Sequence, residues 1–163
     1  MYKLVSLLLR LTLRVRLPLL AALLGLAVIP LAPAATLEQL DLDAYRGKVV
    51  LLDFWASWCG PCKESFPWMQ RMEQRFGDRG LVVIAVNVDH DRALAEQFLR
   101  TQQPRFAIHF DPRGLAAERY GVNAMPSSFY IDRGGKIRYT HLGFVAAERE
   151  DAERQLSALV AEK

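Results

Sequence analysis

The stretch VVLLDFWASWCGPCKESFPWMQRMEQRF, residues 49–76, decides the fold class of this chain. Its first seven residues form an apolar run with the length and β-branched content of a buried strand. A helix is predicted over residues 62–76. Its apolar face has spacings of three or four and consists of Phe66, Met69, Met72 and Phe76. The Cys-Gly-Pro-Cys segment, residues 59–62, therefore joins a buried strand to a helix.

Two cysteines in this position can perform dithiol chemistry. At a helix N-terminus, unpaired backbone amides and the helix dipole favour a thiolate. We therefore predict that Cys59 is the accessible nucleophile and that Cys62, one turn into the helix, is the buried resolving cysteine. The chain has no other cysteine, and a structural disulfide framework would use more. The alternative, a zinc site, would need further cysteine or paired histidine ligands that the sequence lacks.

Asp53 interrupts the apolar strand six residues before Cys59. Burial of a carboxylate is costly and raises its pKa. A carboxyl group placed here could accept the proton of Cys62 when that thiol attacks a mixed disulfide. The alternative is that Asp53 faces solvent at the strand end. Because Leu52 and Phe54 indicate a central strand, we predict the catalytic role.

The rest of the chain continues to alternate strands and helices. A second apolar run, residues 81–88, predicts a strand parallel to the first, with a right-handed crossover. Further on we predict a helix over 92–100, a strand over 106–110, a helix over 115–120, and hairpin strands over 128–132 and 137–142 around the turn Arg133-Gly134-Gly135-Lys136. A last helix opens with acidic residues and packs through Ala152, Leu156, Leu159 and Val160.

Charge divides the chain into two parts. Residues 1–35 hold four of the 21 basic residues and no acidic residue. Their basic, Leu-rich start, the apolar run 17–31 and the small residues 32–35 predict a cleaved signal peptide or an uncleaved membrane anchor. Residues 36–163 then form one domain with 17 basic and 18 acidic residues. This balance offers no basic surface for nucleic acid.

Residues 54–63, FWASWCGPCK, resemble the active-site segment of the thioredoxin superfamily, and residues 65–69 with the export segment are similar to its TlpA/ResA-type branch. The resemblance covers nearly all of residues 37–163. It implies an α/β, three-layer fold with a mixed central sheet, in which residues 106–120 are a TlpA-type insertion of a strand and a helix. The redox-active Cys59–Cys62 disulfide would be the only redox group, with no cofactor and no metal.

The resemblance also implies roles for individual residues. Asp53 falls on the buried acid, Pro126 on a cis-proline facing the dithiol and Gly143 on a glycine of the substrate groove. From the residues alone, the Met125-Pro126 bond would be expected in the commoner trans form. The residues predicted to contact substrate are Trp58, Gly60, Pro61, Met125, Pro126 and Gly143.

Three positions depart from the resembling proteins. Ser65 stands where ResA-type members carry a glutamate, which assigns the acid role to Asp53. Ser127 stands where cytochrome c maturation members often have an acid, which weakens an assignment to cytochrome c-type biogenesis. Ala124 replaces a common loop glycine.

The predicted function is that of a periplasmic protein-disulfide reductase, monomeric, acting on cysteine-containing proteins and supplied by a membrane electron donor. Gly60-Pro61 between the cysteines, with no histidine there, favours the reducing direction. Two alternatives stay open: a dithiol oxidase with reversed electron flow, and a copper-binding or copper-delivery protein using Cys59, Cys62 and His141. Candidate substrates are apocytochrome c, a copper-site assembly protein or another cysteine protein.

Overall fold

The computed structural model describes residues 40–162. The predicted signal or anchor, residues 1–35, lies outside this range. The elements along the described chain are η2 (Asp43–Tyr45), β1 (Val49–Trp55), α2 (Cys62–Phe76), η3 (Gly77–Arg79), β2 (Leu81–Asn87), α3 (Arg92–Gln102), β3 (Ala107–Phe110), α4 (Leu115–Arg119), β4 (Ser127–Ile131), β5 (Ile137–Leu142), η4 (Ala146–Glu148) and α5 (Arg149–Ala161).

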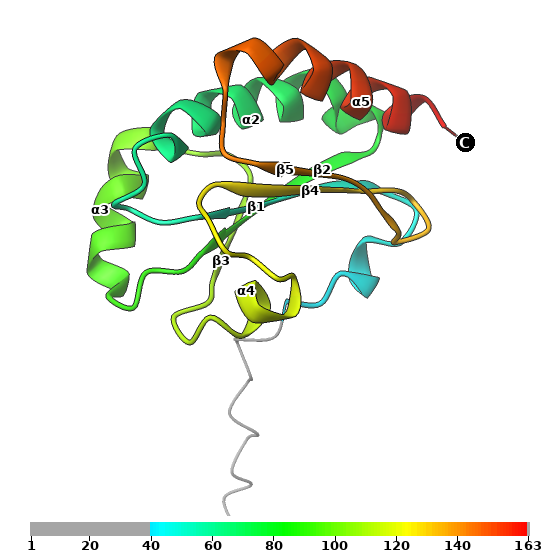
Figure 1. Ribbon diagram of the computed structural model, residues 1–163. Helices are drawn as coiled ribbons and strands as arrows, with labels where there is room; N and C mark the ends of the chain where they lie inside the picture. Colours follow the sequence, from blue (N-terminus) through cyan, green and yellow to red (C-terminus); the bar gives the residue numbers. More distant parts are fainter. Residues whose placement is uncertain (1–39, 163) are drawn as a thin grey trace, which may run out of the picture. The chain divides into compact units, whose positions relative to one another are not determined.

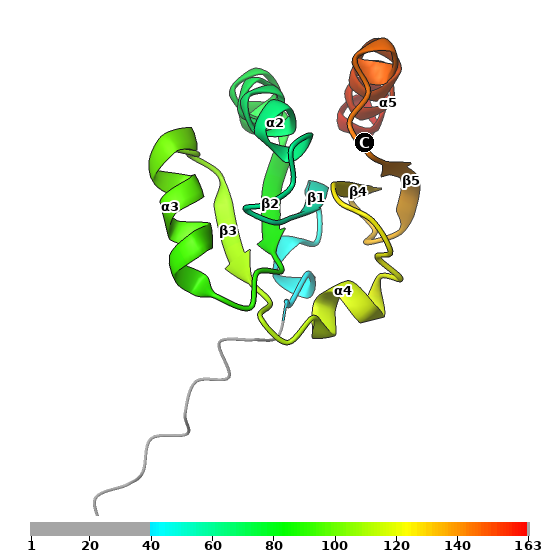
Figure 2. The ribbon, with the colours of Figure 1, turned by 60° about the vertical axis from the view of Figure 1, so that its left-hand side comes forward.

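The strands form one five-stranded sheet in the order β3-β2-β1-β4-β5. Strands β1, β2 and β3 are parallel, and β4 and β5 each run antiparallel to their neighbours. Figure 1 shows α2 and α5 over one face of the sheet and α4 under the other. In Figure 2, α2, α3 and α5 can be seen as separate helices, with α4 on the opposite side of the sheet. This arrangement is the predicted α/β, three-layer, mixed-sheet fold.

Alternation along β1 builds a core on each face of the sheet. All seven β1 residues are buried. Leu51 and Trp55 face the helices α2, α3 and α5, whereas Leu52 and Phe54 face α4 and the lead-in segment. Because both faces are covered, the strand is apolar along nearly its whole length rather than alternating in polarity.

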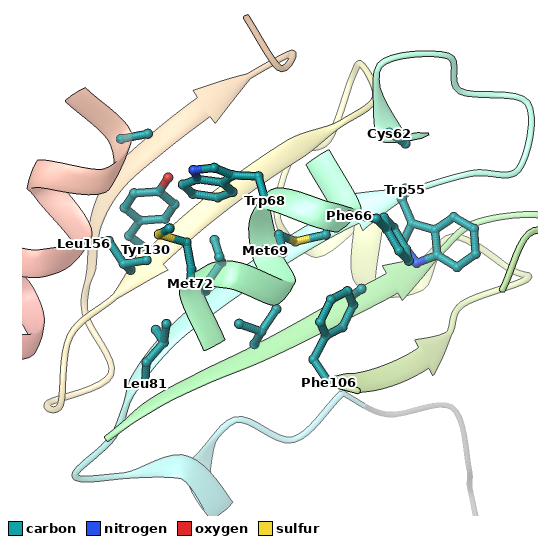
Figure 3. Close-up of a cluster of buried hydrophobic side chains, with 14 of the residues drawn as sticks. Trp55, Cys62, Phe66, Trp68, Met69, Met72, Leu81, Phe106, Tyr130 and Leu156 are labelled. Carbon is teal, nitrogen blue, oxygen red and sulfur yellow. The ribbon is translucent and has the colours of Figure 1, made fainter. Parts of the chain in front are cut away.

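An aromatic cluster anchors α2 and α3 to the sheet. Trp55 packs against Phe66 and Phe98, with ring centroids 4.9 and 4.7 Å away, and Phe66 also meets Phe106 at 5.4 Å. Figure 3 shows this part of the core. The predicted apolar face of α2 is confirmed, since Phe66, Met69, Met72 and Phe76 are all buried.

Most element bounds agree with the sequence to within two residues. Helix α3 continues to Gln102, where Gln103 ends it in a left-handed conformation with φ of 46°. Strand β3 begins at Ala107 because pairing with β2 starts there, opposite Ile84. Within residues 40–162, no helix has the length and apolar character needed to cross a membrane.

Candidate active site

Strand register brings the predicted site segments together at one end of the sheet, where β1 and β5 end and β4 begins. Phe54 near the end of β1 pairs with Ser127 at the start of β4, and Ser127 pairs with Leu142 at the end of β5. This end of the sheet is therefore flanked by the Cys-Gly-Pro-Cys segment, Pro126 and Gly143. The backbone N–H of Gly143 donates to the carbonyl of Pro126 at 2.8 Å. Gly143 has φ of +78°, a conformation that favours glycine.

Cys59 and Cys62 form a disulfide bond with an S–S distance of 2.01 Å. The backbone N–H of Cys62, the first residue of α2, donates to Cys59 Sγ at 3.2 Å. The expectation that Cys62 lies one turn into the helix is wrong, since α2 begins at Cys62 and Cys59 lies three residues before it. The α2 amide nevertheless reaches Cys59 Sγ, because Cys59 and the two residues after it turn back onto the helix start.

The two cysteines differ little in exposure in this disulfide form. Cys59 is 4% exposed and Cys62 is 0% exposed. Cys59 is thus the less buried of the two, and the expected accessibility of its thiol in the reduced protein stays a prediction. The neighbouring Trp58 is 70% exposed. Gly60 and Pro61 are also exposed, so the surface beside Cys59 is formed by residues predicted to contact substrate.

The Met125-Pro126 peptide bond is cis. The resemblance implied this form, whereas the residues alone favoured the trans form. Pro126 is buried and Met125 is half-buried. Their contact with substrate stays a prediction, as do the substrate contacts of Trp58 and Gly143.

Asp53 is fully buried, which rules out the alternative of a solvent-facing strand end. Its register partner on β2 is Ala85, and its partner on β4 is Ser128. The hydroxyl of Ser128 donates to Asp53 Oδ1 at 2.5 Å, while Asp53 Oδ2 has no hydrogen-bond partner among residues 40–162. Burial raises the pKa of Asp53 to about 7, against a lowering effect of the Ser128 hydrogen bond.

This environment suits Asp53 to proton transfer near neutral pH. Leu51 and Trp55, two residues to either side, belong to the same core as Cys62. Asp53 therefore faces the layer that holds Cys62. Sequence reasoning missed Ser128, because nothing local indicates which residue of β4 lies opposite Asp53.

A buried polar network holds the segment that leads to Cys59. The carboxylate of Asp89 accepts from the backbone N–H and the hydroxyl of Ser57, both at 2.8 Å, and from Asn87 Nδ2 at 2.6 Å. Asn87 ends β2 and Ser57 follows β1, so the network ties the ends of two parallel strands. Sequence reasoning also missed this network. The sequence feature that could have indicated this network is the pair of polar residues Asn87 and Asp89 at the end of an apolar run.

The histidines do not join the cysteines. His141 lies beside Gln155, with Nε2 and Oε1 2.8 Å apart, and its ring packs on Tyr130 at 4.8 Å. His90 Nδ1 lies 2.7 Å from the carbonyl of Pro112. In the described part of the chain, no three His, Cys, Asp or Glu side chains are grouped to hold a metal ion. The ligand set of Cys59, Cys62 and His141 behind the copper alternative is thus not assembled.

Comparison with known proteins agrees with this geometry. Residues 27–156 match the Redoxin family. The chain belongs to the Redoxin family. Within that family it is similar to the thiol-disulfide oxidoreductase ResA of Geobacillus thermodenitrificans, with 31% identity over 140 residues, 83% of this chain and 79% of ResA. For other ResA relatives, the match spans 58% of their length.

Solved structures of similar sequence share the fold of this Redoxin-family chain. A Chlorobium tepidum protein assigned as the thiol:disulfide interchange protein DsbE has a TM-score of 0.73 and 45% identity, over 75% of this chain and 86% of that one. The exposed lipoprotein thioredoxin Etrx1 of Streptococcus pneumoniae has a TM-score of 0.63 and 32% identity, over 72% and 90% of the two chains. The predicted membership of the thioredoxin superfamily, in its TlpA/ResA-like branch, is confirmed.

Proposed function

We propose that this Redoxin-family protein is a thiol–disulfide oxidoreductase that reduces disulfide bonds in other proteins. The observation that carries the proposal is the Cys59–Cys62 disulfide at the start of α2, with the Cys62 N–H directed at Cys59 Sγ. A helix N-terminus that donates to a sulfur stabilises the thiolate form of that sulfur after reduction. Cys59 is therefore the nucleophile.

In the first step, the Cys59 thiolate attacks one sulfur of a substrate disulfide. A bond forms between Cys59 Sγ and that sulfur, and the other substrate sulfur leaves as a thiolate. The cis-proline segment and Gly143 lie at the same end of the sheet as Cys59 and would align the substrate backbone beside it. Trp58, Gly60 and Pro61 supply exposed contact surface around the nucleophile.

In the second step, Cys62 attacks Cys59 Sγ and releases the second substrate thiolate. Asp53 accepts the Cys62 proton, because its raised pKa keeps it basic enough to do so near neutral pH. The protein ends with the Cys59–Cys62 disulfide, and its two electrons have passed to the substrate. A thiol reductant or a membrane electron donor must then restore the dithiol. The dithiol pair is the redox group, and the reaction needs no cofactor.

The sequence supports an extracytoplasmic location, in the periplasm or tethered to the membrane by residues 1–35. Etrx1, an exposed lipoprotein, is a relative found in such a setting. Disulfide-bonded substrates persist there. Its substrates would be cysteine-containing proteins, with apocytochrome c and copper-site assembly proteins among the candidates, and the protein would act as a monomer.

The roles of the cysteines are tested by single substitutions. Cys59→Ser should abolish reduction of a protein disulfide such as insulin. Cys62→Ser should instead accumulate a mixed disulfide through Cys59, because attack remains possible and resolution does not. Mass spectrometry of the trapped species measures this. Faster alkylation of Cys62 than of Cys59 in the reduced native protein would contradict the assignment.

The direction of electron flow is tested by the reduction potential. Equilibration of purified residues 36–163 with glutathione buffers should give a value near the reducing end of the range for this fold, about −270 mV, since no residue between the cysteines adds a partner for the thiolate. A value near about −120 mV would favour the dithiol oxidase. The two ends differ by about 7 kcal/mol, so the outcome is decisive.

A further inference from the structure

Three polar side chains form a row across the sheet behind the dithiol. Asp53 on β1 pairs with Ser128 on β4, and Ser128 pairs with His141 on the edge strand β5. Paired residues project from the same face of a sheet, so these side chains lie side by side. The exposed fraction is 0% for Asp53 and 9% for Ser128, and His141 is half-buried. The row thus leads from the core towards the surface.

A small cavity lies beside Ser128 and His141. Its volume is about 20 Å³, and its walls come from α2, β4, β5, α5 and the segment after β5. One water molecule needs roughly 10–15 Å³ and two to four polar partners. Besides the Ser128 hydroxyl, two residues of its wall, Trp68 and Arg149, carry buried donors, Nε1 and Nε, without a partner in residues 40–162. The cavity therefore fits a single bridging water.

Figure 3 shows two side chains that belong to the cavity wall. Trp68 of α2 and Tyr130 of β4 lie next to each other there, on the side of Leu156 in α5 and away from Cys62. Both Trp68 and Tyr130 belong to the cavity wall. Ser128, which donates to Asp53 Oδ1, is also part of this wall, so the cavity adjoins Asp53 by way of Ser128.

We propose that the buried carboxyl group of Asp53 exchanges its proton with solvent through the Ser128 hydroxyl, a water in this cavity and His141. The proposal rests on the proton-transfer role of Asp53 in the proposed function. The two carboxylate oxygens then have separate tasks. Oδ2, which has no partner in the described chain, is available to the dithiol, and Oδ1 is bonded to the exit through Ser128.

The route carries one net proton and no electron. The protonated carboxyl group turns about its Cβ–Cγ bond so that its O–H faces Ser128, while the Ser128 hydroxyl turns towards the cavity water. The carboxyl proton then passes to Ser128 Oγ as the Ser128 hydroxyl proton passes to the water. That water passes a proton to the unprotonated ring nitrogen of His141, which returns one to solvent. The net result is an ionised Asp53 and one proton in solution, and Ser128 donates its newly received proton to the carboxylate.

Other ionisable groups face this route from each neighbouring element. Tyr130 on β4 stays protonated, because burial and the charge of Asp53 raise its pKa. Glu148 of η4 and Arg149 of α5 border the cavity with opposite charges. Cys59 and Cys62 precede the wall residue Trp68 on α2 and do not line the cavity. His141 supplies the imidazole of this wall, and an imidazole can accept a proton at one ring nitrogen and donate one from the other.

Asp53 ionisation can be followed directly in the oxidised protein, without substrate or turnover. A rapid jump from about pH 5 to about pH 9 should remove the infrared band of its protonated carboxyl, because these values bracket its pKa. Asp53→Asn identifies the band by its loss. Ser128→Ala and His141→Phe should slow the decay roughly tenfold or more, since positioned proton transfer contributes on that scale or above.

Two variants serve as controls. Ser128→Thr keeps a hydroxyl and should retain the decay rate of the unmodified protein. Ser127→Ala removes the adjacent hydroxyl, which donates to the carbonyl of Ala124 and lies outside the row, and should also leave the rate unchanged. His141→Phe keeps a ring against Tyr130, so it tests the route even if Ser128→Ala fails to fold.

An unchanged decay rate in either Ser128→Ala or His141→Phe would overturn the route. Loss of rate in Ser128→Thr equal to that in Ser128→Ala would overturn it as well, because the hydroxyl would then not be the carrier. These outcomes are independent of the proton-transfer role of Asp53 in the proposed function, which fails if Asp53→Asn leaves disulfide turnover and its pH profile unchanged.

Discussion

Asp53 carries a carboxyl group where the surrounding strand offers only apolar side chains. Its partner Ser128 satisfies one oxygen and leaves the other without a protein partner in the described chain. Burial therefore dominates, and the pKa of Asp53 rises to about 7. An ordinary aspartate would be ionised throughout the physiological range. Asp53 can instead take up and release a proton within it.

We predict that Asp53→Asn slows disulfide reduction by roughly 10²–10⁴-fold around neutral pH, because positioned proton transfer contributes on that scale. The pH–rate profile should also lose the step near pH 7 that the Asp53 pKa sets. Insulin reduction measured between about pH 5 and about pH 9 checks both effects. A profile that keeps this step in the variant would assign it to another group.

The same substitution should raise the stability of the oxidised protein at alkaline pH. The folded chain holds the Asp53 proton up to about pH 7, whereas an unperturbed aspartate has a pKa of 3.8. Because the folded state binds more protons in this window, the free energy of unfolding falls as pH rises through it. The loss is at most about 4 kcal/mol. Urea unfolding should show Asp53→Asn gaining most above pH 7, and a larger gain in acid would contradict this.

At the scale of elements, the segment between β1 and α2 depends on the end of β2. Asp89 accepts two hydrogen bonds from Ser57, only two residues before Cys59. The backbone N–H of Cys59 in turn donates to the carbonyl of Ala56 at 3.1 Å. The nucleophile is therefore positioned by a residue that follows a different strand.

We predict that Asp89→Ala destabilises the protein by about 2–3 kcal/mol, since it leaves the N–H of Ser57 without its acceptor. Disulfide reduction should slow as well, because Cys59 loses its fixed position. Asp91→Ala is the matched control. It removes the acceptor of the Ala93 N–H at the start of α3, which costs about 1 kcal/mol, and it should leave the alkylation rate of reduced Cys59 unchanged. Equal effects of both substitutions on that rate would refute a positioning role.

At the scale of the whole described domain, Arg133 joins segments far apart in the chain. Its guanidinium donates to the carbonyl oxygens of Gly47, Arg79, Val160 and Glu162, at 2.7 to 3.2 Å. The first carbonyl lies before β1, the second lies before β2, and the last two lie at the C-terminal end of α5. Arg133 lies in the β4–β5 turn, at the end of the sheet opposite the dithiol.

We predict that Arg133→Ala lowers the free energy of unfolding by roughly 2–3 kcal/mol, because several carbonyls lose a charged donor at once. Arg133→Lys should recover only part of this loss, since an ammonium group cannot match the planar fork. Neither substitution should alter the reduction potential, because the dithiol lies at the opposite end of the sheet from Arg133. Chemical denaturation and glutathione equilibration measure the two quantities, and a shifted potential would show coupling between the two ends of the sheet.

The fold class and the place of the dithiol in the chain could be predicted from local sequence patterns. The apolar run 49–55, the spacing of apolar residues in 62–76 and the Cys-Gly-Pro-Cys segment between them are local patterns. Local patterns decide strand, helix and turn because hydrophobic periodicity must match the period of each element. The burial of Asp53 followed from its apolar neighbours for the same reason, and the structure confirms it.

The contacts of these residues, in contrast, depend on how the strands pair in the folded chain. Ser128 meets Asp53 because β4 pairs antiparallel with β1 in one register, and a slip of one residue would bring Phe129 or Ser127 there instead. Asp89 likewise contacts Ser57, and Gly143 contacts Pro126, although neither pair is adjacent in the chain. Strand register and the crossing of parallel strands depend on the packing of the whole sheet. No stretch of residues 40–162 taken alone contains that information.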